Sequence, residues 1–411
     1  MKICLINKFH TVKGGSETYY FGLGELLQKQ GHKVIYFSMK DEKNRPCDQQ
    51  KYFVENVDFN AKMGKLQTVK TALKMLYSFE AKKKFEQLLR DEKPDIVHLN
   101  IFQSQLTGSI VDAAKKHNIP IVYTAHDLKS VCPNYQMLNH GRICEKCLNG
   151  KYANCFKTGC MKDSKAKSLL ATMEAEVYKF KKIYQKMDLV ITPSNFYKKK
   201  LEEAQIVKCP VIHMTNFLPE ETRYQCGAVN GDYFLYFGRL SREKGIMTLV
   251  RAYAKAKINK PLCIVGTGSL KEQIEQLIAE KGLQKRVKLL GFKTGQELKD
   301  IVEGALCVCL PSEWYENGPY SIMEAQAAGR PVIVSSNGGL PELVVDGVTG
   351  YITKPKDVDS LAEKLELCEK KKDWDVEYIV QWAKEKYNPE RYVCELEQEY
   401  QRLCHRKHTS H

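Results

Sequence analysis

Short apolar runs alternate with amphipathic segments along the whole chain, and this alternation constrains the fold more than any other feature. We expect strands at 2–7, 34–37, 95–99, 119–123, 189–192 and 211–213, and again at 233–237, 262–265, 287–290, 306–310 and 332–334. Alternating strands and helices are typical of parallel sheets covered by helices. Because 411 residues are too many for one ordinary core, we predict an α/β fold with two doubly wound, Rossmann-like domains that face each other across a cleft.

The segment 216–231 marks the boundary between the two domains, because it contains Pro219 and Gly227 and few apolar residues. We therefore predict a first domain over 1–217, a second domain over 218–385, and a C-terminal helix over 386–411 that returns to the first domain. A long insert at about 127–165 interrupts the first domain.

The positive charge of the chain is concentrated in its first half. Residues 1–220 contain 36 Lys and Arg against 22 Asp and Glu, whereas the remainder contains 28 against 27. This asymmetry favours an anionic partner for the first domain, such as lipid head groups, diphosphates or nucleic acid. A solvated, lysine-rich surface that only keeps the protein soluble is the alternative.

The sequence shows neither a secretory signal nor an apolar stretch of the ~18–20 residues that a membrane helix needs. We therefore expect a cytoplasmic protein in which most of the 15 cysteines are reduced thiols. The basic helices near 65–92 and 165–186 suit a peripheral position at the anionic inner face of the membrane.

Two basic residues, Arg239 and Lys244, lie in the loop after the first strand of the second domain. An arginine presents a planar fork to a diphosphate and a lysine presents a compact charge. Together they are suited to stabilise a departing nucleotide diphosphate. A surface turn with helix-capping charges is the alternative.

Two glutamates with seven residues between them form the second motif. Glu316 lies in a loop after the strand 306–310, and Glu324 lies about one turn inside the next helix, 320–328. The N–H groups at the start of such a helix bind anions. A glutamate on a largely apolar helix face needs a hydrogen-bonded partner, which a pair of ribose hydroxyls would supply; a salt bridge to a neighbouring helix is the alternative.

These motifs together resemble those of the family-4 retaining glycosyltransferases, which have the GT-B fold. The matching segments, in the family's order, are 14–15, 238–245, 265–268, 316–324, 329–332 and 338–342. The resemblance implies transfer of a sugar from a nucleotide-diphosphate donor to a glycan or lipid-linked acceptor in bacterial polysaccharide biosynthesis, with retention of the anomeric configuration. A UDP-sugar is favoured over a GDP-sugar.

The resemblance also implies roles for residues of the second domain. Arg239 and Lys244 would hold the diphosphate, Glu324 the ribose and Glu316 the donor sugar. The other donor-side residues that it implies are Gly14, Gly15, Gly266, Gly268, Gly291, Phe292, Tyr320 and Ser321. The chain departs from the family at Pro319, where a glycine is usual, and proline has no N–H to donate.

His126 follows the strand 119–123 of the first domain. The resemblance implies that this side chain contacts the transferred sugar; a structural histidine at a strand end is the alternative. We expect His98, inside the strand 95–99, to belong to the core.

The resemblance implies that the leaving phosphate deprotonates the acceptor. The donor motifs include no Asp-x-Asp metal site, and the two cations make a catalytic metal unnecessary, so we expect no cofactor for catalysis.

The insert holds a cluster of cysteines. Cys144 and Cys147 have the spacing of half a zinc site, and Cys155 and Cys160 could supply the other half. We expect this insert to lack a core of its own, so a structural zinc ion would order it beside the acceptor. Buried free thiols are the alternative.

Two other functions compete with the glycosyltransferase. A basic nucleic-acid-binding protein would show aromatic residues interleaved with basic patches; none is clear, so we expect no nucleic-acid partner. Another GT-B enzyme, such as a sugar-nucleotide epimerase, is disfavoured by the paired glutamates.

Overall fold

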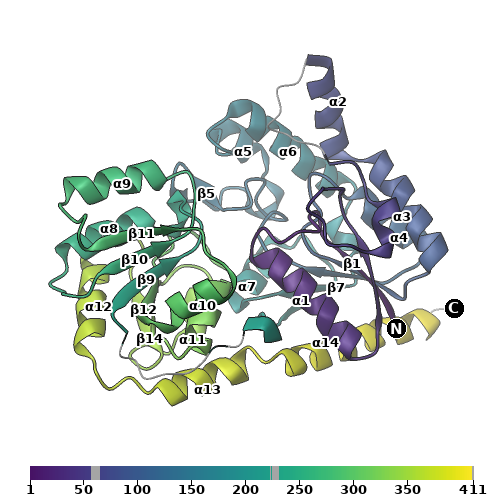
Figure 1. Cartoon of the computed structure of the whole chain (residues 1–411). Coiled ribbons are helices and arrows are strands. Elements are labelled where there is room, and N and C mark those ends of the chain that lie inside the picture. The colour runs from purple at the N-terminus through teal and green to yellow at the C-terminus, as the bar shows by residue number, and fades with distance from the viewer. Residues whose placement is uncertain (57–64, 223, 225–230, 410–411) are drawn as a thin grey trace. The chain divides into compact units, whose positions relative to one another are not determined.

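A computed structural model of the chain shows two compact units, each built on a six-stranded parallel sheet (Figure 1). The structure describes residues 1–56, 65–222, 224 and 231–409, so residues 223 and 225–230 of the predicted linker 216–231 lie outside the described residues. Unit 1 comprises Met1–Asn216 and Pro389–His411, and unit 2 comprises Phe217–Asn388. The predicted two-domain α/β fold is confirmed.

The sheet of unit 1 has the strand order β2-β1-β3-β4-β7-β8. Its strands are β1 (Lys2–Ile6), β2 (Lys33–Phe37), β3 (Ile96–Leu99), β4 (Ile121–Thr124), β7 (Leu189–Thr192) and β8 (Val211–His213). The order reverses between β1 and β3, which therefore form a topological switch point. In open sheets of this kind, ligands bind where the carboxyl ends of the strands meet such a switch point.

The helices of unit 1 connect these strands. They are α1 (Gly15–Lys29), α2 (Lys65–Leu76), α3 (Phe79–Glu92), α4 (Ser109–Lys116), α5 (Ala153–Thr158), α6 (Lys165–Phe180), α7 (Asn195–Ala204) and α14 (Pro389–Thr409). Ser78, Ser164 and Ser194 cap α3, α6 and α7 by accepting a hydrogen bond from the N–H three residues later. Within the described ranges, no helix is both long and apolar enough to cross a membrane.

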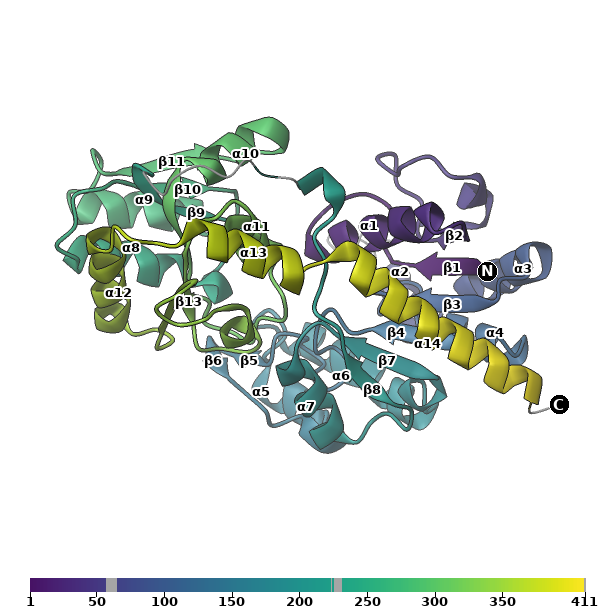
Figure 2. The same cartoon turned by 90° about the horizontal axis from the view of Figure 1, so that it is seen from below.

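The C-terminal helix α14 belongs to unit 1, where it packs against α1 (Figure 2). The Tyr392 hydroxyl lies 2.6 Å from that of Tyr19, and the Tyr400 hydroxyl lies 2.5 Å from Nδ1 of His98. His98 is fully buried, as expected. The last helix of the chain therefore completes the core of the unit that contains the first strand.

Unit 2 has the strand order β11-β10-β9-β12-β13-β14, with its switch point between β9 and β12. Its strands are β9 (Tyr233–Phe237), β10 (Leu262–Val265), β11 (Val287–Gly291), β12 (Ala305–Leu310), β13 (Val332–Ser335) and β14 (Gly350–Thr353). Its helices are α8 (Ile246–Lys255), α9 (Lys271–Glu280), α10 (Gly295–Glu303), α11 (Tyr320–Ala327), α12 (Val358–Lys370) and α13 (Val376–Lys386). Sequence analysis missed only β14 among these strands.

The expectation that the insert lacks a core is wrong. The insert contains a small antiparallel pair, β5 (Leu138–Asn139) with β6 (Arg142–Ile143), followed by α5. Cys147, Tyr152 and Cys155 are buried in a hydrophobic cluster with Ala171 of α6. The core became visible only in the structure because α6, which follows the insert in sequence, supplies one side of it.

Candidate functional site

Lys244 and Glu316 meet at the switch point of unit 2. Lys244 ends a short 3-10 turn after β9, and Glu316 lies in the loop after β12. Lys244 Nζ is 2.7 Å from Glu316 Oε1, and the two side chains are 16% and 5% exposed. The carboxyl ends of neighbouring parallel strands lie at one edge of a sheet. Two motifs that are far apart in the sequence therefore form one site.

Glu316 is ionised in this site. Burial alone would raise the pKa of its carboxyl, but the Lys244 ammonium and the hydrogen bond from Ser312 outweigh burial and hold the pKa below its ordinary value. A carboxylate only accepts hydrogen bonds, whereas a lysine ammonium has three N–H donors. Glu316 can thus accept hydroxyl groups, and Lys244 can bind an anion while it keeps its bond to Glu316.

The support for Glu316 includes residues that sequence analysis missed. Ser312 Oγ donates to Glu316 Oε1 at 2.5 Å, and the Ser312 carbonyl accepts from Ser335 Oγ and Asn337 Nδ2. Gly338 has a φ of 66°, and a Cβ there would lie 2.3 Å from the Glu316 carbonyl oxygen. In the sequence, the run of small polar residues after β13 could have indicated this loop.

Arg239 is the less constrained of the two predicted cations. Its side chain is 63% exposed, and its guanidinium lies 3.5 Å from Glu243. Solvent screens such an exposed pair, so it holds the side chain weakly. The structure places both predicted cations on one loop and fixes only Lys244.

Glu324 lies one turn inside α11. Burial raises the pKa of its carboxyl from 4.5 to about 7, although a hydrogen bond from Tyr224 and the charge of Lys299 both act to lower it. Hydrogen-bond donors that favour the charged form would bring this pKa down again. The raised pKa of this half-buried carboxyl therefore favours a ligand that offers hydroxyl groups.

The start of α11 accommodates the departure at Pro319. This residue is the N-cap, with a φ of −71° and a ψ of 126°, which proline adopts without strain. The amides of Tyr320 and Ser321 belong to the first turn of α11, at the end of the helix that attracts anions. Their contact with a donor phosphate or sugar stays a prediction.

The structure gives Gly266 and Gly268 a packing role. A Cβ on Gly266 would lie 1.9 Å from the Gly238 carbonyl oxygen, and a Cβ on Gly268 would lie 2.2 Å from that of Leu240. The missing Cβ atoms let the loops after β9 and β10 lie against each other. The direct contact of these glycines with a donor stays a prediction.

The end of β11 carries the residues that were expected beside the base. Gly291 is in the left-handed region with a φ of 70°, and its carbonyl accepts a hydrogen bond from the Gly266 N–H at 2.7 Å. Phe292 follows with its side chain largely exposed. This ring is accessible for stacking, and its contact with a base stays a prediction.

His126 in unit 1 is held by Asn100, which sequence analysis missed. His126 Nε2 lies 2.8 Å from Asn100 Oδ1, while Asn100 Nδ2 donates to the Ile6 carbonyl at 3.1 Å. The Asn100 oxygen is therefore the acceptor, and the proton of His126 sits on Nε2. Burial lowers the pKa of His126 to about 3, so this imidazole is neutral at physiological pH.

The Gly14-Gly15 pair opens α1 after β1. Gly14 is the N-cap with extended backbone, and a Cβ there would lie 3.9 Å from Glu17 Oε2, an ordinary contact. Within the described part of unit 1, neither the backbone conformation nor the packing requires a glycine at this position. The close approach of a donor, which was the predicted reason for it, stays a prediction.

The structure gathers the cysteines of the insert. The Sγ atoms of Cys155 and Cys160 are 3.5 Å apart, and this hydrogen bond lowers the pKa of Cys160 to about 6. Burial raises the pKa of Cys147 to about 12, with contributions from the nearby Cys132 and Cys144. In the part of the chain that the structure describes, no three His, Cys, Asp or Glu side chains are arranged to hold a metal ion. The predicted zinc site stays a prediction.

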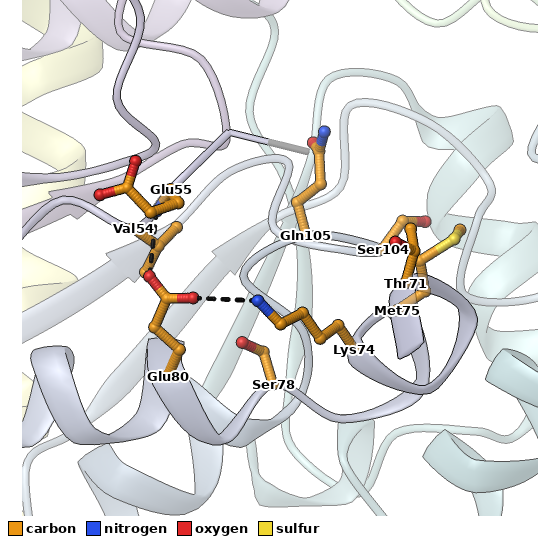
Figure 3. A pocket seen from close by; sticks show the side chains of 9 residues that line it. All are labelled: Val54, Glu55, Thr71, Lys74, Met75, Ser78, Glu80, Ser104 and Gln105. Carbon is orange, nitrogen blue, oxygen red and sulfur yellow. Dashed lines mark hydrogen bonds and ion pairs between the residues drawn. The ribbon is translucent and has the colours of Figure 1, made fainter. Parts of the chain in front are cut away.

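Figure 3 shows a hollow beside α2 in unit 1. Its lining comprises Val54, Glu55, Thr71, Lys74, Met75, Ser78, Glu80, Ser104 and Gln105. Within the hollow, Glu80 forms an ion pair with Lys74 at 3.5 Å and accepts a hydrogen bond from the Glu55 N–H at 3.1 Å. None of the residues predicted to bind donor or acceptor is among them.

Comparison with known proteins identifies the family. The model described as Glycosyltransferase Family 4 matches residues 13–217, and the model described as Glycosyl transferases group 1 matches residues 220–388. An uncharacterized 42.6 kDa protein in the cps region of Klebsiella pneumoniae is 25% identical over 93% of this chain and 98% of its own length.

Two further relatives match over part of their length. An uncharacterized glycosyltransferase of Methanocaldococcus jannaschii is 40% identical over 38% of this chain, and the match spans 40% of that protein. A putative colanic acid biosynthesis glycosyltransferase of Escherichia coli is 25% identical over 50% of this chain and 54% of its own length.

Solved structures share the fold over nearly the whole chain. A sucrose-phosphate synthase of Thermosynechococcus elongatus has a TM-score of 0.71 at 21% identity, with 98% of each chain covered. Anabaena HepE in complex with UDP and glucose has a TM-score of 0.65 at 19% identity, covering 97% of this chain and 100% of that chain. The chain thus belongs to glycosyltransferase family 4 and has its GT-B fold.

Proposed function

We propose that this protein is a retaining glycosyltransferase that moves a sugar from a UDP-sugar to a lipid-linked glycan acceptor in surface polysaccharide biosynthesis. The observation that carries the proposal is the buried Lys244–Glu316 pair at the switch point of unit 2. It sets a cation and a hydroxyl-accepting carboxylate side by side, as the diphosphate and the sugar of one donor require.

The roles of the residues follow from their charge states. Lys244 and the exposed Arg239 bind the diphosphate and stabilise the charge that develops on it as the bond from the anomeric carbon to the phosphate oxygen breaks. Glu316 accepts hydroxyl groups of the sugar. Glu324 accepts those of the ribose, and the amides of Tyr320 and Ser321 bind a phosphate oxygen.

The acceptor oxygen attacks the anomeric carbon from the face that the leaving group vacates. Its proton passes to the departing phosphate oxygen, so neither a protein nucleophile nor a catalytic metal takes part. His126, neutral and fixed by Asn100, contacts the transferred sugar. These steps yield a free nucleoside diphosphate and a product with the configuration of the donor.

The choice of donor and acceptor rests on different observations. A structural neighbour was solved with UDP and glucose, which favours a uridine nucleotide. One relative is assigned to colanic acid biosynthesis and another lies in a cps region, which favours a surface polysaccharide. The excess of Lys and Arg in residues 1–220 favours an acceptor carried on an anionic membrane, on its cytoplasmic side.

A thermal-shift screen against nucleotides and nucleotide sugars tests the donor. UDP should raise the melting temperature by mass action more than GDP does, and Lys244→Met should abolish the difference. The anomer of the product, determined by NMR on a defined acceptor, tests retention, and an inverted product contradicts the proposal. Transfer that persists undiminished in excess EDTA supports catalysis without a metal.

The same enzyme preparation separates the proposal from an epimerase. A glycosyltransferase releases nucleoside diphosphate in proportion to added acceptor, whereas an epimerase consumes its nucleotide sugar without one. Acceptor-independent turnover to a second sugar would replace the proposal with the epimerase.

A further inference from the structure

Exposed apolar side chains gather around α6 in unit 1. Of the twelve large apolar side chains that are exposed in the described structure, six lie on α6, on α2 or α5 beside it, or at the start of α3, which follows α2 in the chain. They are Leu73, Phe79, Phe156, Leu169, Met173 and Phe180, called here the α6 surface. Both α2 and α5 pack against α6 (Figure 1). Scattered exposed apolar residues are normal, but a group of this kind marks an interaction site.

The α6 surface follows one side of the helix. Leu169, Met173 and Phe180 are spaced by four and seven residues, so they lie on one face. The opposite face, with Ala171 and Tyr178, is buried in the unit. A helix of 16 residues is about 24 Å long, and packing within unit 1 leaves this face uncovered along most of that length.

Aromatic residues extend the surface at both ends of α6. The Lys165 ammonium, at the start of α6, lies 5.6 Å from the Phe156 ring. Beyond its end, the Lys181 ammonium lies 4.6 Å from the Tyr77 ring, which packs edge-on against Phe79. Phe180 and Phe79 are 87% and 77% exposed. Phenylalanine side chains are common on the apolar face of helices that lie in a membrane interface, and tyrosine rings are enriched at the level of the head groups.

Lysines surround the same surface. Residues 162–182 contain six lysines and three carboxylates, which are Asp163, Glu174 and Glu176. Glu174 is buried and paired with Lys129 at 2.9 Å, so it does not offset the exposed positive charge. Glu176 lies on the exposed side between Met173 and Phe180. The charge around the α6 surface is therefore positive overall.

We propose that the α6 surface docks unit 1 on an anionic lipid bilayer, with α6 lying in the plane of the interface. An amphipathic helix with large apolar residues on one side and lysines around it binds such surfaces by burying the apolar side among the head groups. The long lysine side chains reach outward to the lipid phosphates. The proposal rests on the lipid-linked acceptor proposed above, because it brings the enzyme to the surface where that acceptor lies.

Co-flotation with vesicles tests the proposal on the full chain without donor or acceptor. The protein should float with vesicles of phosphatidylcholine that contain phosphatidylglycerol and should bind pure phosphatidylcholine far more weakly. Each exposed lysine should contribute roughly fivefold to the partition. Raised salt should weaken the binding because it screens these charges.

Two pairs of variants separate the apolar from the charged contribution. Met173→Ser with Phe180→Ser should lower binding at least roughly tenfold, and Lys167→Gln with Lys182→Gln should lower it only on anionic vesicles. The matched controls in unit 2, Val348→Ser with Leu367→Ser and Lys281→Gln with Lys285→Gln, should bind as the wild type does. All of these side chains are at least partly exposed, and an unchanged melting temperature verifies the fold.

Two outcomes overturn the proposal. One is vesicle binding that the variants in α6 leave unchanged. The other is a dimer in light scattering that Met173→Ser with Phe180→Ser dissociates, because a second copy would then cover this surface. The two proposals fail separately. A protein that floats with vesicles but transfers no sugar contradicts the proposed function and leaves the docking surface standing. A protein that glycosylates a soluble acceptor but does not float contradicts only the docking surface.

Discussion

Lys244 and Glu316 reach one point from the ends of two adjacent strands and form a nearly buried ion pair of 2.7 Å. Such a pair contributes little net stability, because removing two charges from water offsets their attraction. Its position at the switch point of the sheet, at the edge where ligands bind, points to a binding role instead. Substitutions at this pair should therefore change the stability and the activity of the protein to different extents.

Lys244→Met should lower sugar transfer by about 10²–10³, because the charge on the leaving diphosphate loses a preorganised partner. It should also destabilise unit 2 by about 3–5 kcal/mol, because Glu316 is left buried and unpaired. The double variant Lys244→Met/Glu316→Gln should recover much of the stability and none of the activity. Lys255→Met, which breaks an exposed pair with Asp359, is the control and should change neither. Recovery of transfer in the double variant contradicts the role of Lys244.

Glu324 should make donor binding depend on pH. Since its folded pKa is raised from 4.5 to about 7, the stability that this group contributes is complete below 4.5 and is lost as the pH rises through 7. Ribose hydroxyls favour the carboxylate, so binding of UDP near pH 7 should release protons. Calorimetry in two buffers of different ionisation enthalpy measures this release. Glu324→Gln should lower it to what the UDP phosphate releases on its own, and the exposed control Glu280→Gln should leave it unchanged; equal proton release in all three proteins contradicts the ribose contact.

The strands were predictable because buried parallel strands are nearly continuous apolar runs, which the sequence shows directly. The missed strand β14 has the sequence GYIT, which contains a glycine and only one aliphatic residue, and it depends on pairing with β13. Local sequence carries no sign of such a pairing. The core of the insert escaped prediction for the same reason, because Ala171 lies outside the insert.

The candidate site, too, could be predicted from the sequence only in part. Charged motifs at strand ends identified Lys244 and Glu316 separately as donor-side residues, yet their contact depends on β9 and β12 being neighbours, which is a property of the sheet. Gly268 was predicted to serve the donor, whereas its missing Cβ also makes room for the Leu240 carbonyl. Asn100 was missed because its partner His126 follows β4, the strand next to β3 in the sheet, and this neighbourhood is not visible in the sequence.

His126 should not titrate between pH 5 and 8, because burial keeps its pKa at about 3. Asn100→Asp would place a carboxylate beside Nε2 and raise this pKa to about 4–6. The pH profile of transfer should then lose rate on its acid side, where the imidazolium forms. Asn259→Asp, at an exposed position of unit 2, should keep the wild-type profile. An unaltered profile in Asn100→Asp would remove His126 from the site.

The cysteines of the insert should bind one zinc ion per chain, measured by ICP-MS on protein purified under reducing conditions. The ligands would be Cys144, Cys147, Cys155 and Cys160, and their sulfur atoms would have to move into a tetrahedral arrangement. Cys144→Ser with Cys147→Ser should remove the metal, and Cys394→Ser, which changes an exposed cysteine of α14, should not.

Thiol labelling distinguishes the zinc site from free thiols. The hydrogen bond with Cys155 lowers the pKa of Cys160 and so favours its reactive thiolate, and iodoacetamide should therefore modify it faster than an ordinary thiol in zinc-free protein. Bound zinc should protect it until a chelator is added. Fast labelling that a chelator does not accelerate, in protein without zinc, would show that the cluster consists of free thiols. The small core around Cys147, Tyr152 and Cys155 would then hold the insert together by itself.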